Sequence, residues 1–123
     1  TQPDTWLGAQ EQAEAMGGQL AMVENEEANQ WLLNKFGETS NTWIGLNDSP
    51  IYNNREGEFT WISGDPAAYT NWNVNEPNNV EKLFWEGEDF VEMFRHGGWN
   101  DMPQNPTFLN LGYRPGIVEF PSL

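Results

Sequence analysis

The sequence has no cysteine and a single histidine among its 123 residues. Without cysteine the chain can form no disulfide bonds, zinc–thiolate sites or cysteine nucleophiles. One histidine without cysteine supplies no set of nucleophile, base and orienting group, so we expect a protein that is not an enzyme. Stability must therefore come from packing or from bound ions.

Basic residues are also scarce. Five Lys and Arg stand against 19 Asp and Glu, which gives a formal net charge of −14. Such a charge repels nucleic acid and anionic membrane surfaces, so neither is an expected partner. No segment approaches the roughly 18 consecutive apolar residues that cross a membrane, and the first residues lack the basic and apolar regions of a signal peptide. We expect no membrane insertion.

Aromatic residues, in contrast, are abundant. They make up 14% of the chain and include seven Trp, whereas disordered acidic chains are poor in aromatics. The length suits one folded domain. The many carboxylates are ligands of the kind that calcium prefers, or they form a solvated acidic surface. Composition leaves both interpretations open.

Helical spacing of apolar residues predicts two helices in the first part of the chain. The first spans 5–16 and ends at Gly17. After an extended piece over 20–23, Asn25 caps the second, which Gly37 closes in a left-handed conformation. The residues with this spacing are Trp6, Ala9, Ala13 and Met16 in the first helix and Ala28, Trp31, Leu32 and Phe36 in the second.

Beyond residue 41 the pattern changes to short β-branched and aromatic segments bounded by turn residues. Trp99 is expected to pack beneath a turn. The stretch 63–89 shows little apolar periodicity, and long loops of this kind tend to be functional. The predicted strands cover residues 42–46, 59–62, 89–94 and 116–120.

Three short clusters in the second half are rich in carboxylate and amide oxygens. They are Glu76-Pro77-Asn78, Glu88-Asp89 and Trp99-Asn100-Asp101. Calcium takes six to eight such oxygens. An amide that gives its oxygen to an ion keeps its NH2 group as a donor, and a carboxylate keeps a spare acceptor. The clusters together predict a calcium site that presents donors and acceptors outward.

In order and spacing, these motifs resemble those of the C-type lectin-like domain, and the likeness covers nearly the whole chain. The resemblance implies an α+β fold with two helices, small antiparallel sheets and a long calcium-binding loop region. It also implies that residues 1–123 form one carbohydrate-recognition domain. The segments that carry it are TWLGAQEQAEAMGGQLAMV, ENEEANQWLLNKF, WIGL, EGEFTW, NW, EPN, GED, WND and GIVEF.

The resemblance further implies that one calcium ion binds two vicinal sugar hydroxyls, and that its ligands also hydrogen-bond to them. Glu before Asn around the proline is similar to the mannose-type pattern, which favours mannose, glucose, N-acetylglucosamine and fucose. The galactose-type pattern has the reverse order. The implied metal ligands, which are also the implied sugar-binding residues, are Glu76, Asn78, Glu88, Asn100 and Asp101.

The implied function is calcium-dependent glycan binding for cell-surface adhesion by a secreted, extracellular or cell-surface protein. The alternative is a protein-contact or ice-contact module that keeps the fold without binding sugar. Many family members hold a second, auxiliary calcium ion, and the alternative reading of those positions is ordinary polar loop residues. The matching positions are Asp48, Glu56, Asn79 and Asp89.

Two features could be mistaken for site residues. Gln2-Pro3-Asp4 has the galactose-type sequence, but it precedes the first helix and has no neighbouring ligands. We expect Asp4 to act in capping that helix, for which Asp4 and Thr5 are the two candidates. His96 is expected in a surface turn near the calcium loops.

The sequence also departs from the family pattern. The four half-cystine positions of most members are occupied by Ala13 with Val118 and by Phe90 with Gln104. The usual first strand is missing, because Thr1–Asp4 cannot replace it, which suggests a module from a larger multidomain protein. The apolar stretch 79–87 is longer than usual, and its aromatic residues could stack on a sugar or anchor the loop in the core.

Overall fold

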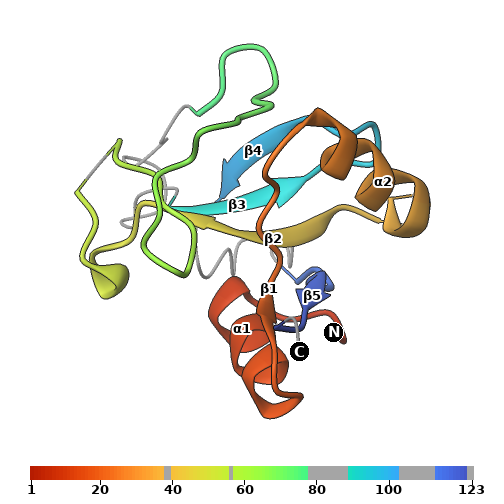
Figure 1. Ribbon diagram of the computed structural model, residues 1–123, viewed down its shortest axis with the longest axis vertical. Helices are drawn as coiled ribbons and strands as arrows, with labels where there is room; N and C mark the ends of the chain where they lie inside the picture. Colours follow the sequence, from red (N-terminus) through yellow and green to blue (C-terminus); the bar gives the residue numbers. More distant parts are fainter. Residues whose placement is uncertain (38–39, 56, 78–88, 103–112, 122–123) are drawn as a thin grey trace.

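The computed structural model describes residues 1–37, 40–55, 57–77, 89–102 and 113–121. Antiparallel pairing forms a two-stranded sheet, β1-β5, and a three-stranded sheet, β2-β3-β4 (Figure 1). The expected α+β fold is confirmed. The elements are α1 (Trp6–Ala15), β1 (Gln19–Leu20), α2 (Glu26–Phe36), β2 (Thr42–Asn47), the 3-10 helix η1 (Pro50–Tyr52), β3 (Phe90–Met93), β4 (Trp99–Met102) and β5 (Val118–Glu119).

Both predicted helices are confirmed, and side-chain caps begin them. The Thr5 hydroxyl accepts a hydrogen bond from the Gly8 amide at 3.1 Å, so Thr5 rather than Asp4 is the N-cap of α1. Gly17 follows α1 at φ 88°. The Asn25 side chain accepts from the Ala28 amide at 2.8 Å and caps α2 as predicted.

The expected left-handed conformation of Gly37 is wrong. Gly37 follows α2 at φ −81°, and its amide donates to the Leu33 carbonyl at 2.8 Å. A Cβ at this position would lie 2.5 Å from Cδ1 of Leu33. Glycine is therefore required by close packing rather than by backbone conformation.

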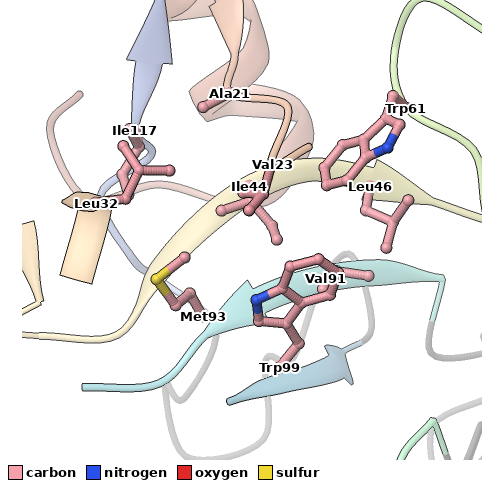
Figure 2. Packing of buried hydrophobic residues seen from close by; sticks show 10 residues of the cluster. All are labelled: Ala21, Val23, Leu32, Ile44, Leu46, Trp61, Val91, Met93, Trp99 and Ile117. Atoms are coloured by element: carbon pink, nitrogen blue, oxygen red, sulfur yellow. The ribbon is translucent and has the colours of Figure 1, made fainter. Parts of the chain in front are cut away.

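Every residue of β2 is buried because the strand lies between two apolar clusters. Alternate side chains of a strand face opposite sides, so Ile44 and Leu46 enter one cluster while Trp43 enters the other. Figure 2 shows the first cluster, in which Ile44 and Leu46 face Val91 of β3 and Trp99 of β4.

The second cluster joins α1 to the sheets. It is formed by Trp6, Ala9, Leu20, Trp43 and Phe90. The rings of Trp6 and Phe90 lie 4.7 Å apart. Phe90, at one of the family's half-cystine positions, thus fills core volume, while its expected counterpart Gln104 lies outside the described residues.

Two predictions for the strands need correction. Residues 59–62 form no strand, because Thr60 makes only isolated bridges, to Asn47 and Pro66, before the chain turns at Gly64. Proline has no amide proton, so that ladder cannot extend. Residues 99–102 form a strand that the sequence did not predict, and Trp99 is its fully buried first residue.

The first residues of the chain lie beside residues 114–116. Asp4 and Arg114 exchange two main-chain hydrogen bonds, of 3.0 and 2.9 Å, and the amino group of Thr1 donates to the Gly116 carbonyl at 2.8 Å. These contacts form an isolated bridge and no strand. None of the helices in the described ranges is long and apolar enough to span a membrane.

A polar anchor crosses the core. Asn29 of α2 is 1% exposed; its Nδ2 donates to the Gly97 carbonyl at 3.0 Å, and its Oδ1 accepts from Nε1 of Trp99 at 2.8 Å. Gly97 lies in the turn between β3 and β4, at φ 97°. The side-chain amide of Asn29 thus fixes α2 against both this turn and a fully buried tryptophan of the core.

Replacing Asn29 with Ala should destabilise the fold, because the Trp99 donor and the Gly97 carbonyl both lose this partner in a buried site. We expect a loss of about 2–4 kcal/mol in the free energy of unfolding, measured by urea denaturation. The control is Gln30→Ala, a neighbouring exposed position. A loss no larger than that of the control would contradict the anchor.

A buried ion pair lies on the other face of β3. The carboxylate of Glu92 is 1% exposed and pairs with Arg114, whose guanidinium lies 5.7 Å from the Trp43 ring centre. Asn41 donates to Glu92 at 3.4 Å. Burial raises the pKa of Glu92, and the attraction of Arg114 only partly opposes this shift.

A raised pKa in the folded state means that the contribution of Glu92 to stability is complete below its unfolded pKa and is lost as pH rises through the folded pKa. Between pH 4 and pH 7, the unfolding free energy of the wild type should therefore fall relative to that of Glu92→Gln. Urea denaturation in EDTA measures it. A shift in favour of the wild type would show that the attraction of Arg114 outweighs desolvation.

Candidate functional site

The segment that precedes the EPN motif is joined to the start of β4 by main-chain hydrogen bonds. The Trp99 amide donates to the Asn71 carbonyl, and the Asn73 amide donates to the Trp99 carbonyl, both at 2.9 Å. These bonds form a parallel bridge between Trp72 and Trp99. The loop 71–77 is thereby held beside β4, at the top of the view in Figure 1.

A tight turn then carries the chain to Glu76. The Glu76 amide donates to the Asn73 carbonyl at 2.9 Å, and Asn75 adopts φ 68°, a left-handed conformation that asparagine tolerates better than most residues. Glu76 is half-buried, with its Oε2 atom buried, and the peptide bond to Pro77 is cis. A single tight turn, 73–76, therefore separates Glu76 from the Trp72–Trp99 bridge.

On β4, Asn100 is partly exposed and Asp101 is 1% exposed. The side chain of Asn73 donates from Nδ2 to Oδ1 of Asn100 at 2.9 Å. Asn73 thus contacts both the turn that bears Glu76 and the amide of Asn100. Through Asn73 the turn that bears Glu76 lies next to Asn100 of β4, while Asn78 and Glu88 lie outside the described residues.

The donor chemistry of this place fits a calcium ion. Glu76 and Asp101 bring carboxylates and Asn100 brings an amide oxygen, which are hard ligands of the type that calcium selects. Within the described ranges, no group of three or more His, Asp and Glu could hold a metal by itself. The described residues thus supply part of the predicted ligand set.

An aromatic cluster supports the loop from below. The rings of Trp61, Tyr69 and Trp72 meet the Trp99 ring edge-on, with centroids 5.9, 5.7 and 6.0 Å away. Phe59 packs on Trp72 at 4.9 Å. The aromatic residues of 59–72 therefore anchor the loop in the core and keep the Asn71–Asn73 segment against β4.

Sequence reasoning missed three asparagines that hold the site. Asn29 binds Trp99, Asn71 donates to the Gly97 carbonyl at 2.8 Å, and Asn73 donates to Asn100. Asn71 was visible only as part of the NW motif, and Asn73 carried no signal of its own. Their partners are 26 to 70 residues away in sequence, so only the folded chain reveals them.

The predicted auxiliary site is also partly described. The Asp48 amide donates to the Asp89 carbonyl at 3.0 Å, so these two residues lie together at the ends of β2 and β3. Asp48 is 1% exposed, and its Oδ2 accepts from the Gly57 amide at 2.8 Å. Glu56 and Asn79 lie outside the described residues, as does the stretch 79–87.

Of the two features set aside from the site, Asp4 lies far from it and His96 lies in the turn beside Gly98. The carboxylate of Asp4 accepts from the Thr5 amide at 2.8 Å and from the side chain of Gln12 at 2.9 Å, beside α1. Figure 1 places this end of the chain on the side opposite the 71–77 loop. His96 is exposed in the β3–β4 turn, as predicted, and its ring packs 5.4 Å from Phe94.

The chain matches the sequence model of one protein family. Residues 2–108 match the model of the lectin C-type domain. The chain belongs to the C-type lectin domain family. Among curated relatives, the low affinity immunoglobulin epsilon Fc receptors of Mus musculus and Homo sapiens are 36% and 34% identical over 96 residues, or 78% of this chain. The chain spans about a quarter of the length of these relatives, which is 26% and 27%.

Solved C-type lectin domains have the same architecture. The cow domain of CD23, crystallised in the presence of a GlcNAc2Man3 oligosaccharide, is 28% identical with a TM-score of 0.78, covering 99% of this chain and 84% of that one. The mouse scavenger receptor C-type lectin domain is also 28% identical, with a TM-score of 0.75 over 83% of this chain and 75% of that one.

Membership in this family settles the general class of function. C-type lectin domains are carbohydrate-binding modules that are not enzymes and that generally depend on calcium, so the expectations of a lectin fold and of no enzymatic activity are confirmed. Carbohydrate binding is the function that this lectin domain shares with its structural neighbours.

Proposed function

We propose that the domain binds mannose-type sugars through a calcium ion held by Glu76, Asn78, Glu88, Asn100 and Asp101. The observation that carries the proposal is the position of Asn73. It closes the turn before Glu76 and donates to Asn100, so two of the clusters converge at one place. The bound ion would have two coordination positions left open, which the oxygens of two adjacent sugar hydroxyls would occupy.

Hydrogen bonding explains why this mixture of ligands suits a diol. A hydroxyl has one proton to donate and two lone pairs to share. Glu76 can accept the proton of one hydroxyl, and the NH2 group of an asparagine can donate to its oxygen. A sugar with the wrong stereochemistry would leave such groups unpaired in a partly dry site, which lowers its affinity.

The order of acid and amide favours mannose-type sugars. Glu76 precedes Pro77 and Asn78 follows it, which is the order that resembles the mannose-type pattern. The cow CD23 domain, which is 28% identical to this chain, was solved in the presence of an oligosaccharide of GlcNAc and mannose, and this supports a preference for mannose-type sugars. Mannose, glucose, N-acetylglucosamine and fucose are the proposed ligands.

We place a second, auxiliary ion at Asp48, Glu56, Asn79 and Asp89, because Asp48 and Asp89 lie in main-chain contact. Relatives named as receptors support a place for the domain in a larger extracellular or cell-surface protein that acts in adhesion. Weak single sites would then be combined for avidity.

Protein contact is the second candidate function. The relatives named as immunoglobulin Fc receptors support it, and large apolar residues are exposed away from the loop, with Trp31 57% and Phe120 60% exposed. A protein interface of this kind would not require the order of Glu76 and Asn78.

Calorimetric titration with mannose, fucose and N-acetylglucosamine tests the leading proposal. Binding is expected in calcium and should disappear in EDTA. Calcium should also raise the melting temperature, since an ion at 100 times its Kd stabilises the native state by about 2.7 kcal/mol. Galactose is the matched control sugar. A domain that binds none of these sugars in calcium would contradict the proposal.

Acid should weaken the sugar complex. Protons compete with calcium for the ligand carboxylates, so affinity for calcium and sugar should fall together as pH approaches about 4 to 5. Titrations at pH 7.5, 6 and 4.5 in saturating mannose measure the fall. Affinity that stays constant over this range would argue against carboxylate ligation.

Exchanging acid and amide tests the sugar preference. The double variant Glu76→Gln with Asn78→Asp keeps the charge of the motif and reverses its order, so binding should move from mannose towards galactose by about tenfold or more. Calorimetry with both sugars measures the ratio. A protein interface would leave partner binding unchanged in this variant, which separates the two candidate functions.

A further inference from the structure

Asn73 lies between the two halves of the candidate site without belonging to the predicted ligand set. We propose that Asn73 is a positioning residue that fixes the carboxamide of Asn100 and thereby decides which hydrogen-bonding group Asn100 presents to a sugar. This inference rests on the proposed function, because it assigns Asn100 to the sugar and calcium site.

Hydrogen bonds hold both the main chain and the side chain of Asn73. Its amide donates to the Trp99 carbonyl and its carbonyl accepts from the Glu76 amide, both at 2.9 Å. Its Nδ2 donates to Oδ1 of Asn100 at 2.9 Å. With the backbone held at both ends, the side chain has little freedom to leave Asn100.

The space for this side chain depends on Gly98. A Cβ on Gly98 would lie 1.7 Å from Oδ1 of Asn73. Any other residue at position 98 would therefore push Asn73 away from β4. Gly98 itself is buried in the turn that precedes Trp99. The absence of a side chain there lets the amide of Asn73 lie flat against the start of β4.

The consequence for Asn100 follows from the shape of an amide. Its oxygen and its NH2 group point in different directions, and exchanging them requires a rotation of the group. Because Nδ2 of Asn73 can only donate, it holds Oδ1 of Asn100 toward itself. The NH2 group of Asn100 is then directed elsewhere as a donor, while Oδ1 keeps a second lone pair for an ion.

The other polar neighbours of Asn100 do not impose this orientation. Its partner across the sheet is Glu92, whose carboxylate is engaged by Arg114 and Asn41. Asn71 donates to the Gly97 carbonyl and not to Asn100. Of these three side chains, Asn73 is the one that donates to Asn100.

The decisive variant is Asn73→Asp, which has the same shape but offers no donor. The new carboxylate should rotate Asn100 so that its NH2 group faces inward and its oxygen faces the sugar, which removes one donor from the site. Mannose affinity should fall about tenfold, the equivalent of one lost hydrogen bond. Calcium affinity, measured by terbium luminescence excited through tryptophan, should fall as well, because Oδ1 of Asn100 turns away from the ion. Mannose is therefore titrated in saturating calcium, where the loss of the donor to the sugar remains.

Two further variants separate positioning from simple destabilisation. Leu32→Ala, the control, removes core packing on α2 and should lower the melting temperature without a selective loss of mannose binding. Gly98→Ala displaces the Asn73 side chain without changing it, and should weaken mannose binding as Asn73→Asp does. It also keeps the test available if Asn73→Asp folds poorly.

The side-chain amide signals of Asn73 and Asn100 in NMR spectra give a readout that needs no sugar. In the calcium-free wild type, the NH2 protons of Asn73 should be protected from exchange, and Asn100→Ala should abolish this protection. Protection that is unchanged in Asn100→Ala would overturn the proposed contact.

The outcomes distinguish this inference from the proposed function. If the wild type binds mannose in calcium and Asn73→Asp binds it equally well, Asn73 does not position Asn100. If the wild type binds none of the sugars, the proposed function fails and the presentation of a donor to sugar fails with it. The NMR result then reports only whether the contact exists.

Discussion

The functional part of this domain depends on the short parallel pairing between residues 71–73 and Trp99. Two main-chain hydrogen bonds of 2.9 Å attach a loop of little regular structure to the first residue of β4. Trp99 is itself fully buried and fixed by Asn29 through its indole nitrogen. The polar groups near the sugar site are therefore held by a residue of the hydrophobic core, and a disturbance of the core at Trp99 would reach the site directly.

The acidity of the chain bears on the proposed calcium site. A chain with a net charge of −14 repels itself, and clustering carboxylates in loops increases this cost. A divalent cation would reduce the repulsion where the loops converge. Packing supports the rest of the fold without disulfides: Phe90 fills the space beside Trp6, and β2 is buried on both faces. In this cysteine-free domain, the packing of the core also holds the 71–77 loop, through Trp99.

Much of the architecture could be predicted from local patterns. Helical spacing placed α1 and α2, and Asn25 marked the start of the second helix because its side chain caps the nearby Ala28 amide. The predictions that were wrong concern features set by distant contacts. Gly37 is required by the packing of Leu33 rather than by a left-handed turn, and Thr60 pairs too briefly to form a strand because Pro66 lies opposite.

The chemical groups available to this protein can be read from its residue types and short motifs. These are local properties, and they include the carboxylates and amides, the absence of thiols and the order of Glu76 and Asn78 around Pro77. How these groups are held depends on contacts between distant segments of the fold. The bond from Asn73 to Asn100 spans 27 residues, and that from Asn29 to Trp99 spans 70. Such contacts form because packing brings distant segments together and buried polar groups must then find partners, a condition that no local pattern records.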